Sequence, residues 1–164
     1  MDRPDPLTTD DARALVAELA RRRQTVATAE SLTAGLLAAT LAGVPGASAV
    51  LRGGLITYAV DTKTSLAGVP PEILDSVGPV AAATARALAD GARLRCAATW
   101  GVGLTGVAGP DSHGGFAAGT VFLGLAGPGG TEAVELALTG SRWDIRYGAV
   151  GAAISSLYAL VTAG

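Results

Sequence analysis

Cysteine and histidine each occur only once in this chain of 164 residues, as Cys96 and His113. A single cysteine cannot form an intrachain disulfide, and it excludes a Cys-x-x-Cys metal site. A single histidine excludes the His-Glu-x-x-His zinc motif and any cage built from several histidines. We therefore expect no metal and no cofactor, and the lack of disulfides is typical of a reducing compartment.

Aromatic side chains are also scarce, at 4% of the chain, whereas hydrophobic residues make up 49% and glycine occurs 23 times. The core must therefore be built from small side chains, with backbones packed closely together. Charge of neither sign dominates, because 12 Lys and Arg residues stand against 14 Asp and Glu residues. A protein that follows duplex nucleic acid needs a dense basic face, so we expect no nucleic-acid partner.

Long hydrophobic runs are missing as well. No segment reaches the ~20 consecutive apolar residues that a membrane-spanning helix needs. The amino-terminal segment Met1-Asp2-Arg3-Pro4-Asp5 lacks the apolar stretch of a signal peptide. We predict a cytoplasmic protein with no membrane partner, and its length suits one domain over residues 1–164.

Apolar residues recur with a helical period in some segments and with a strand period in others. Thr9-Asp10 can cap a first helix, and Gly127-Pro128-Gly129-Gly130 predicts the turn of a β-hairpin. The expected order is helix 10–23, strand 25–29, a helix to about 41, strand 49–58, a helical turn after 70–71, helix 80–94, strand 99–104, strands 119–125 and 132–138, and helix 143–161. This alternation predicts an α/β fold, a three-layer α/β/α sandwich with a mixed β-sheet.

Three short motifs have both a structural and a functional interpretation. Arg21-Arg22-Arg23 could bind nucleic acid, but at a helix end it more often complements the helix dipole. Gly101, Gly103 and Gly106 match the G-x-G-x-x-G spacing of dinucleotide folds, yet two of them fall inside an expected strand, which favours tight packing. Gly53-Gly54 predicts a bulge or a close backbone approach.

A catalytic triad would have to use His113, which lies beside Gly114 and Gly115. A glycine-flanked loop holds a general base poorly, so a solvated loop is the favoured interpretation of this residue. A nucleophilic enzyme would then need Ser or Thr activated by Lys or Tyr.

Ser31 is the best placed nucleophile, at a junction between a strand and a helix. Backbone N–H groups and the positive end of the helix dipole could stabilise an oxyanion there. Position alone favours a helix cap. Gly35 permits the close approach of a ligand without proving one.

Candidate partners of Ser31 also have ordinary interpretations. Lys63 follows the expected strand that carries Tyr58, and by its position an ordinary surface lysine is the favoured interpretation, although a partly buried lysine could serve as a base. Tyr58 could relay a proton, but an aromatic residue in a strand more often packs in the sheet. Arg142 and Arg146 are four residues apart on one helical face, which suits a phosphate or carboxylate, although solvent exposure is the usual state of such residues.

Four blocks that contain these residues resemble the CinA carboxy-terminal family. Residues 29–35 resemble its AES-x-T-x-G segment, and residues 53–58 with Lys63 resemble its second block. Residues 105–110 resemble the third block, and residues 140–142 with 145–146 the fourth. The blocks occur in order and span nearly the whole chain, so their joint occurrence is specific.

The resemblance implies a hydrolase, because the family includes stand-alone nicotinamide mononucleotide deamidases. Ser31 would attack the carboxamide carbon while Lys63 and Tyr58 manage the proton, and nicotinic acid mononucleotide and ammonia would be the products. Substrate contacts are then expected at Glu30, Thr33, Gly35, Thr105, Gly106, Gly109, Arg142 and Arg146. The partners implied are a small nucleotide substrate and a second copy of the chain in a homo-oligomer, a dimer by family habit.

Departures from the family pattern cluster near the expected pocket. Leu32 stands where many relatives have a small residue or cysteine, and Ala34 where they have glycine. Phe116-Ala117-Ala118 replaces a Lys-Pro-Val type sequence, and Ser141 an acidic or amide residue. Two alternatives therefore stay open: a non-catalytic nucleotide- or partner-binding module, and a hydrolase of a different small amide.

Overall fold

Five strands form one open sheet in the order β2-β1-β3-β4-β5 in the computed structural model, which describes residues 3–164. The first two residues of the expected domain, and of its polar amino terminus, lie outside the described part. The strands are β1 (Val26–Glu30), β2 (Leu51–Ile56), β3 (Trp100–Gly106), β4 (Thr120–Gly127) and β5 (Gly130–Ala137). Strands β2, β1 and β3 are parallel, and β4 and β5 are antiparallel additions. The expected hairpin at the glycine-rich turn is confirmed.

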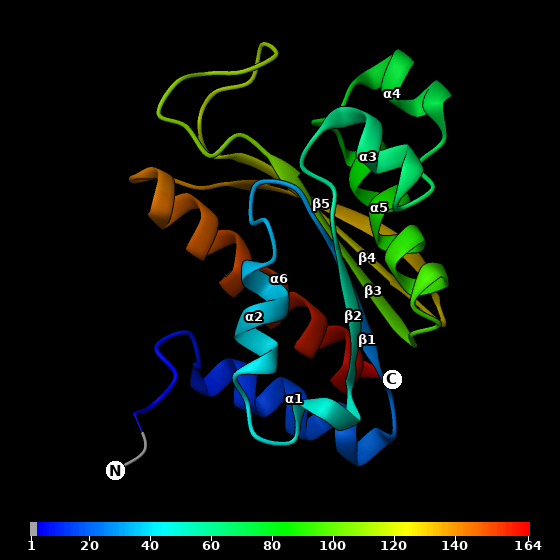
Figure 1. The fold of residues 1–164 in the computed structure, drawn as a ribbon, viewed down its shortest axis with the longest axis vertical. Coiled ribbons are helices and arrows are strands. Elements are labelled where there is room, and N and C mark those ends of the chain that lie inside the picture. The colour runs from blue at the N-terminus through cyan, green and yellow to red at the C-terminus, as the bar shows by residue number, and fades with distance from the viewer. Residues whose placement is uncertain (1–2) are drawn as a thin grey trace.

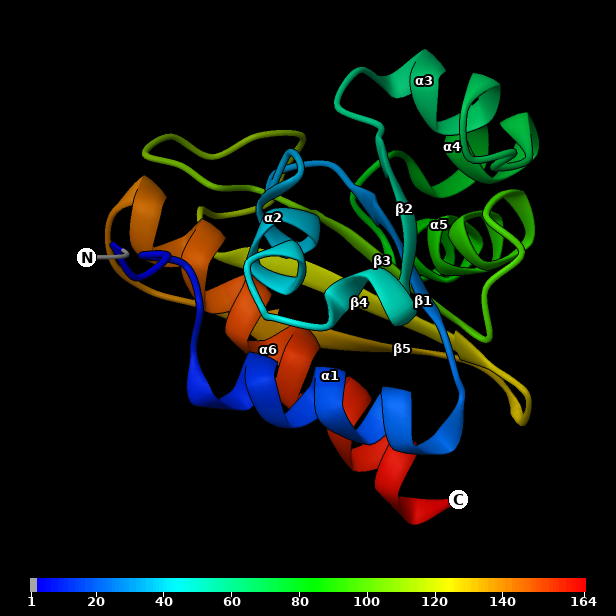
Figure 2. The same cartoon turned by 60° about the horizontal axis from the view of Figure 1, so that its bottom comes forward.

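Helices cover both faces of this sheet (Figures 1 and 2). One face carries α1 (Asp10–Arg22), α2 (Leu36–Ala42) and α6 (Arg142–Ala163). The other carries α3 (Val60–Ser65), α4 (Pro71–Val77) and α5 (Ala82–Arg95), and a short 3₁₀ turn, η1 (Ala47–Ala49), precedes β2. The three-layer α/β/α fold with a mixed sheet, expected from the sequence, is confirmed.

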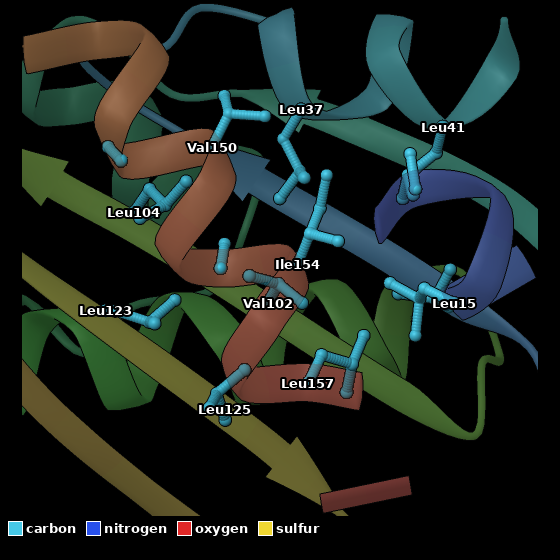
Figure 3. Packing of buried hydrophobic residues seen from close by; sticks show 14 of the residues in the cluster. Leu15, Leu37, Leu41, Val102, Leu104, Leu123, Leu125, Val150, Ile154 and Leu157 are labelled. Atoms are coloured by element: carbon cyan, nitrogen blue, oxygen red, sulfur yellow. The ribbon is translucent and has the colours of Figure 1, made fainter. Parts of the chain in front are cut away.

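The larger core lies between the sheet and the layer of α1, α2 and α6. Figure 3 shows side chains from these helices meeting those of β3 and β4, with Ile154 of α6 near the centre. By length and mean hydropathy α6 could span a membrane. No segment of that kind was expected from the sequence. The apolar side of α6 is instead buried in this core, as in a core helix of a globular protein.

Glycines let α5 approach the opposite face of the sheet closely. A Cβ atom on Gly103 would lie 2.5 Å from the carbonyl oxygen of Ala85, and one on Gly101 would meet the carbonyl oxygen of Ala89. The G-x-G-x-x-G spacing therefore serves packing, as its place in a strand indicated. The expected irregularity in β2 is also present, because the pairing register with β1 shifts before Gly53.

Arg21 and Arg22 form ion pairs with Glu18 in the last turn of α1, and Arg23 caps its end in the left-handed conformation. The structural interpretation of the arginine run fits this arrangement. Most expected boundaries shift by one or two residues; β2, for example, ends at Ile56 instead of Tyr58. Helix α3, which the sequence did not predict, follows it.

Candidate active site

The loops that carry the candidate residues meet at one edge of the sheet, where the parallel strands end. The connection from β1 runs to α2 on one face, whereas the connection from β2 runs to α3 on the other (Figure 1). A crevice opens where neighbouring parallel strands send their connections to opposite faces. Ser31 follows β1 and Lys63 lies beyond β2, so the two approach each other across this crevice.

Lys63 and Ser31 are hydrogen bonded. The Nζ of Lys63 donates to the Oγ of Ser31 at 3.1 Å and to the carbonyl oxygen of Thr57 at 2.7 Å. The Thr57 carbonyl can accept from the amine in either protonation state. A neutral amine held by one N–H in this way can direct its lone pair at the serine hydroxyl, which is the geometry of a general base.

Lys63 is 1% exposed, although it is a lysine in a short helix near the surface. Burial lowers the pKa of its amine from 10.5 to about 8, because an apolar environment disfavours the charged form. The interpretation of Lys63 as an ordinary surface lysine is therefore wrong. The sequence missed α3, and this helix turns the side chain inward.

Ser31 does not cap a helix. Helix α2 begins at Leu36, and its N-cap residue is Gly35, with a φ of 96° in the left-handed region. Glu30 supplies the capping oxygens instead: its carboxylate accepts the N–H of Leu37 at 2.8 Å and that of Ala38 at 3.1 Å. Because Glu30 occupies this helix end, an oxyanion at Ser31 would depend on the backbone N–H groups that directly follow the serine.

A cavity of about 360 Å³ opens beside Ser31 and Lys63. Tyr58 lies at its mouth with 58% of its surface exposed, so packing within the sheet is not its role. The guanidinium of Arg142 donates to the Tyr58 hydroxyl at 3.2 Å and to the carbonyl oxygen of Gly109 at 2.6 Å. Of the residues expected at the site, the cavity is lined by Ser31, Tyr58, Lys63, Thr105, Gly106, Gly109 and Arg142.

The other four candidates, Glu30, Thr33, Gly35 and Arg146, lie outside the cavity lining and support the Ser31 loop. The Nε of Arg146 donates to the carbonyl oxygen of Leu32 at 2.8 Å, and its Nη2 to that of Thr33 at 3.3 Å. Thr33 is fully buried, and its hydroxyl has no hydrogen-bond partner within residues 3–164. The two arginines share a helical face, but Arg142 lines the cavity whereas Arg146 contacts the Ser31 loop.

The sequence missed several lining residues. Val60 lies in the unpredicted helix α3, and Pro79 and Val80 precede α5 without any local signal. The loop after β3 adds Asp111, Ser112 and His113, which the glycine-rich composition marked only as a loop. His113 is exposed, and its backbone forms an isolated β-bridge with Phe116. Within residues 3–164, no three His, Cys, Asp or Glu side chains converge on a common metal position.

Thr105 and Gly106 line the cavity where β3 ends. The Thr105 hydroxyl donates to the carbonyl oxygen of Pro79 at 2.6 Å, so it ties the end of β3 to the segment before α5. Its donor is thereby used within the protein, and only its lone pairs face a ligand. The anion contact expected at this hydroxyl must come from other groups in the cavity.

Comparison with known proteins agrees with this fold and these motifs. The family model of the CinA C-terminal domain matches residues 8–161. A CinA-like protein of Anaeromyxobacter is 50% identical over 146 residues, which are 87% of this chain and 35% of the relative. A putative competence-damage inducible protein of Streptococcus pneumoniae is 45% identical over 137 residues, 83% of this chain and 33% of the relative. The chain thus spans about a third of the length of these curated relatives.

Solved structures are similar over almost their whole length. A competence/damage inducible protein from Agrobacterium tumefaciens has a TM-score of 0.89 and 34% identity, covering 98% of this chain and 99% of that one. A CinA superfamily protein from Klebsiella pneumoniae has a TM-score of 0.92 and 26% identity, covering 94% and 98%. With its four sequence blocks gathered around one cavity, the chain belongs to the CinA family, through the family's carboxy-terminal domain.

Proposed function

We propose that this protein is a serine amidohydrolase that converts nicotinamide mononucleotide and water into nicotinic acid mononucleotide and ammonia. The observation that carries the proposal is the buried Lys63 amine, 3.1 Å from the Ser31 hydroxyl at the wall of a cavity. A lysine with a pKa of about 8 is partly neutral near neutral pH and can accept the serine proton. The choice of nucleotide rests on the family resemblance.

The chemistry proceeds in two halves. Lys63 takes the hydroxyl proton while the Ser31 oxygen bonds to the carboxamide carbon, and the protonated amine then returns a proton to the leaving nitrogen. The C–N bond breaks, ammonia leaves and an acyl-serine remains. Water attacks the acyl carbon with Lys63 again as base. The C–O bond to Ser31 then breaks, the protonated amine returns its proton to the Ser31 oxygen, and the carboxylic acid is released.

Negative charge that develops on the carboxamide oxygen needs a donor. The N–H of Leu32 has no acceptor among residues 3–164, and Leu32 lines the cavity next to the nucleophile. The backbone N–H after a nucleophile is a common oxyanion donor. Arg146 holds the Leu32 carbonyl at 2.8 Å and so fixes the orientation of the following peptide unit, while Tyr58 is exposed enough to meet the substrate.

Ammonia release from a small panel of amides tests the proposal. Nicotinamide mononucleotide should be hydrolysed with much higher kcat/KM than nicotinamide, its riboside or glutamine. If only a different amide were hydrolysed, the proposed substrate would be wrong and the proposed amidohydrolase chemistry would stand. Binding of the nucleotide without any ammonia release would favour a non-catalytic nucleotide-binding module.

A further inference from the structure

Asp111 is the only carboxylate among the described residues that line the cavity beside Ser31 and Lys63. The ion pairs within residues 3–164 all lie on α1, between Arg13 and Asp10 and between Glu18 and two arginines. The Asp111 carboxylate is exposed and accepts no hydrogen bond from the described part of the chain. A charged group that has no partner in the protein is available to a ligand.

The loop that carries Asp111 is anchored at its far side. His113 and Phe116 exchange two backbone hydrogen bonds, of 2.9 and 3.0 Å. The ring of Phe116 packs edge to face against Phe122 of β4, with 6.3 Å between the ring centroids. Phe122 in turn belongs to a buried cluster with Val80. These contacts fix the loop beginning two residues beyond Asp111, so its backbone stays close to the cavity.

The cavity also carries a permanent positive charge, on Arg142. Arg142 and Asp111 form no ion pair with each other, so the cavity presents separate positive and negative groups. The third charged group, Lys63, is neutral when it serves as the base. The Debye length is about 8 Å at physiological ionic strength, so a ligand confined to a cavity of about 360 Å³ feels both remaining charges.

We propose that Asp111 is a specificity-determining residue that selects amides carried on a positively charged ring. Together with Arg142, it matches the cavity to a zwitterionic amide with a cationic ring and an anionic substituent. This inference rests on the proposed function, since the pyridinium ring of nicotinamide mononucleotide is cationic and its phosphate is anionic. The carboxylate acts through its charge, and Asn in its place keeps the shape and removes that charge.

Binding measurements separate this charge effect from turnover. In an inactive Ser31→Ala background, calorimetry would compare nicotinamide mononucleotide with its reduced form, which has the same sugar and phosphate but a neutral ring. Asp111→Asn should weaken binding of the oxidised nucleotide about fivefold to thirtyfold and that of the reduced form less than twofold. The control variant Asp75→Asn removes the same charge from exposed α4, outside the cavity lining. It should change the affinity for neither nucleotide.

Each result decides between distinct explanations. A selective loss for the oxidised nucleotide, which shrinks as salt is raised, supports the assignment. An unchanged ratio of the two affinities in Asp111→Asn overturns the assignment of Asp111. The proposed substrate still stands in that case if the parent protein, Ser31→Ala with Asp111 intact, binds nicotinamide mononucleotide. Failure of both nucleotides to bind the parent protein overturns the proposed substrate and this inference together.

Discussion

The amine of Lys63 lies 3.1 Å from the hydroxyl of Ser31, although the two residues are 32 positions apart in the chain. Burial gives this amine a pKa of about 8, and the Thr57 carbonyl holds it in place. A serine and a lysine carried by the segments that follow two adjacent parallel strands can thus form a nucleophile and base without the single histidine.

Replacing Ser31 by alanine should abolish hydrolysis and leave the protein folded. The hydroxyl makes one hydrogen bond, with Lys63, and caps no helix, so its loss should cost only about 1 kcal/mol of stability. Loss of a nucleophile should lower kcat by about three orders of magnitude or more. Ammonia release and urea unfolding would be measured on the same sample. Near-normal turnover would show that another residue is the nucleophile.

The activity should rise with pH as the Lys63 amine loses its proton. Because its pKa is lowered to about 8, kcat/KM should increase up to about pH 8 and then level off. Lys63→Arg keeps a positive charge that does not deprotonate in this range, so it should be nearly inactive at every pH. A Lys63→Arg enzyme with most of its activity would mean that the residue contributes only charge.

Lys63 should also make stability depend on pH. The folded state binds this proton less tightly than the unfolded chain, whose lysine has the ordinary pKa of 10.5. Between about pH 8 and pH 10.5 the unfolded state holds more protons, so the free energy of unfolding should rise with pH, by about 3 kcal/mol in all. Denaturant unfolding of Lys63→Met should lack this rise. If the free energy of unfolding changed with pH in the same way for both proteins, the burial of the Lys63 amine would be contradicted.

Arg142 and Arg146 should differ in their effects on a phosphate. Arg142 lines the cavity, whereas Arg146 binds the carbonyls of the Ser31 loop. The nucleotide should be preferred over its nucleoside by about tenfold to a hundredfold in kcat/KM, since a charge-assisted hydrogen bond contributes roughly 1.5–3 kcal/mol. Arg142→Ala should remove most of that preference. Arg146→Ala should lower both rates by a similar factor, and a selective loss for the nucleotide would assign the phosphate to Arg146 instead.

Glu30 should stabilise the fold without contacting the substrate. Its buried carboxylate accepts hydrogen bonds from the Thr28 hydroxyl and from two N–H groups of α2. Glu30→Gln turns one acceptor into a donor, which should cost about 1–3 kcal/mol in urea unfolding. Glu72→Gln, on the exposed side of α4, should cost almost nothing. A drop in substrate affinity at unchanged stability would place Glu30 in the substrate site after all.

Much of the fold could be predicted from local patterns alone. The apolar residues of α1, namely Ala12, Leu15, Val16 and Leu19, are all buried as their spacing predicted. The glycine-rich turn forms the hairpin, and the order of elements leads to the mixed sheet. Strand ends were less certain, because the strand-like pattern of β2 continues past Ile56 into the loop with Tyr58. Helix α3 has six residues, too few for a helical period to stand out.

The sequence by itself identified part of the cavity wall, namely Ser31 after β1 and Thr105, Gly106 and Gly109 at the end of β3, because these blocks are contiguous and distinctive. Only the tertiary structure decided what each polar side chain does. Whether Lys63 is a surface charge or a buried base depends on elements distant in sequence that exclude water from it. Arg142 and Arg146 lie one helical turn apart, so they reach a cavity and a loop, respectively. The burial of Lys63 and the contacts of the two arginines arise from packing between segments distant in sequence, and no local pattern encodes them.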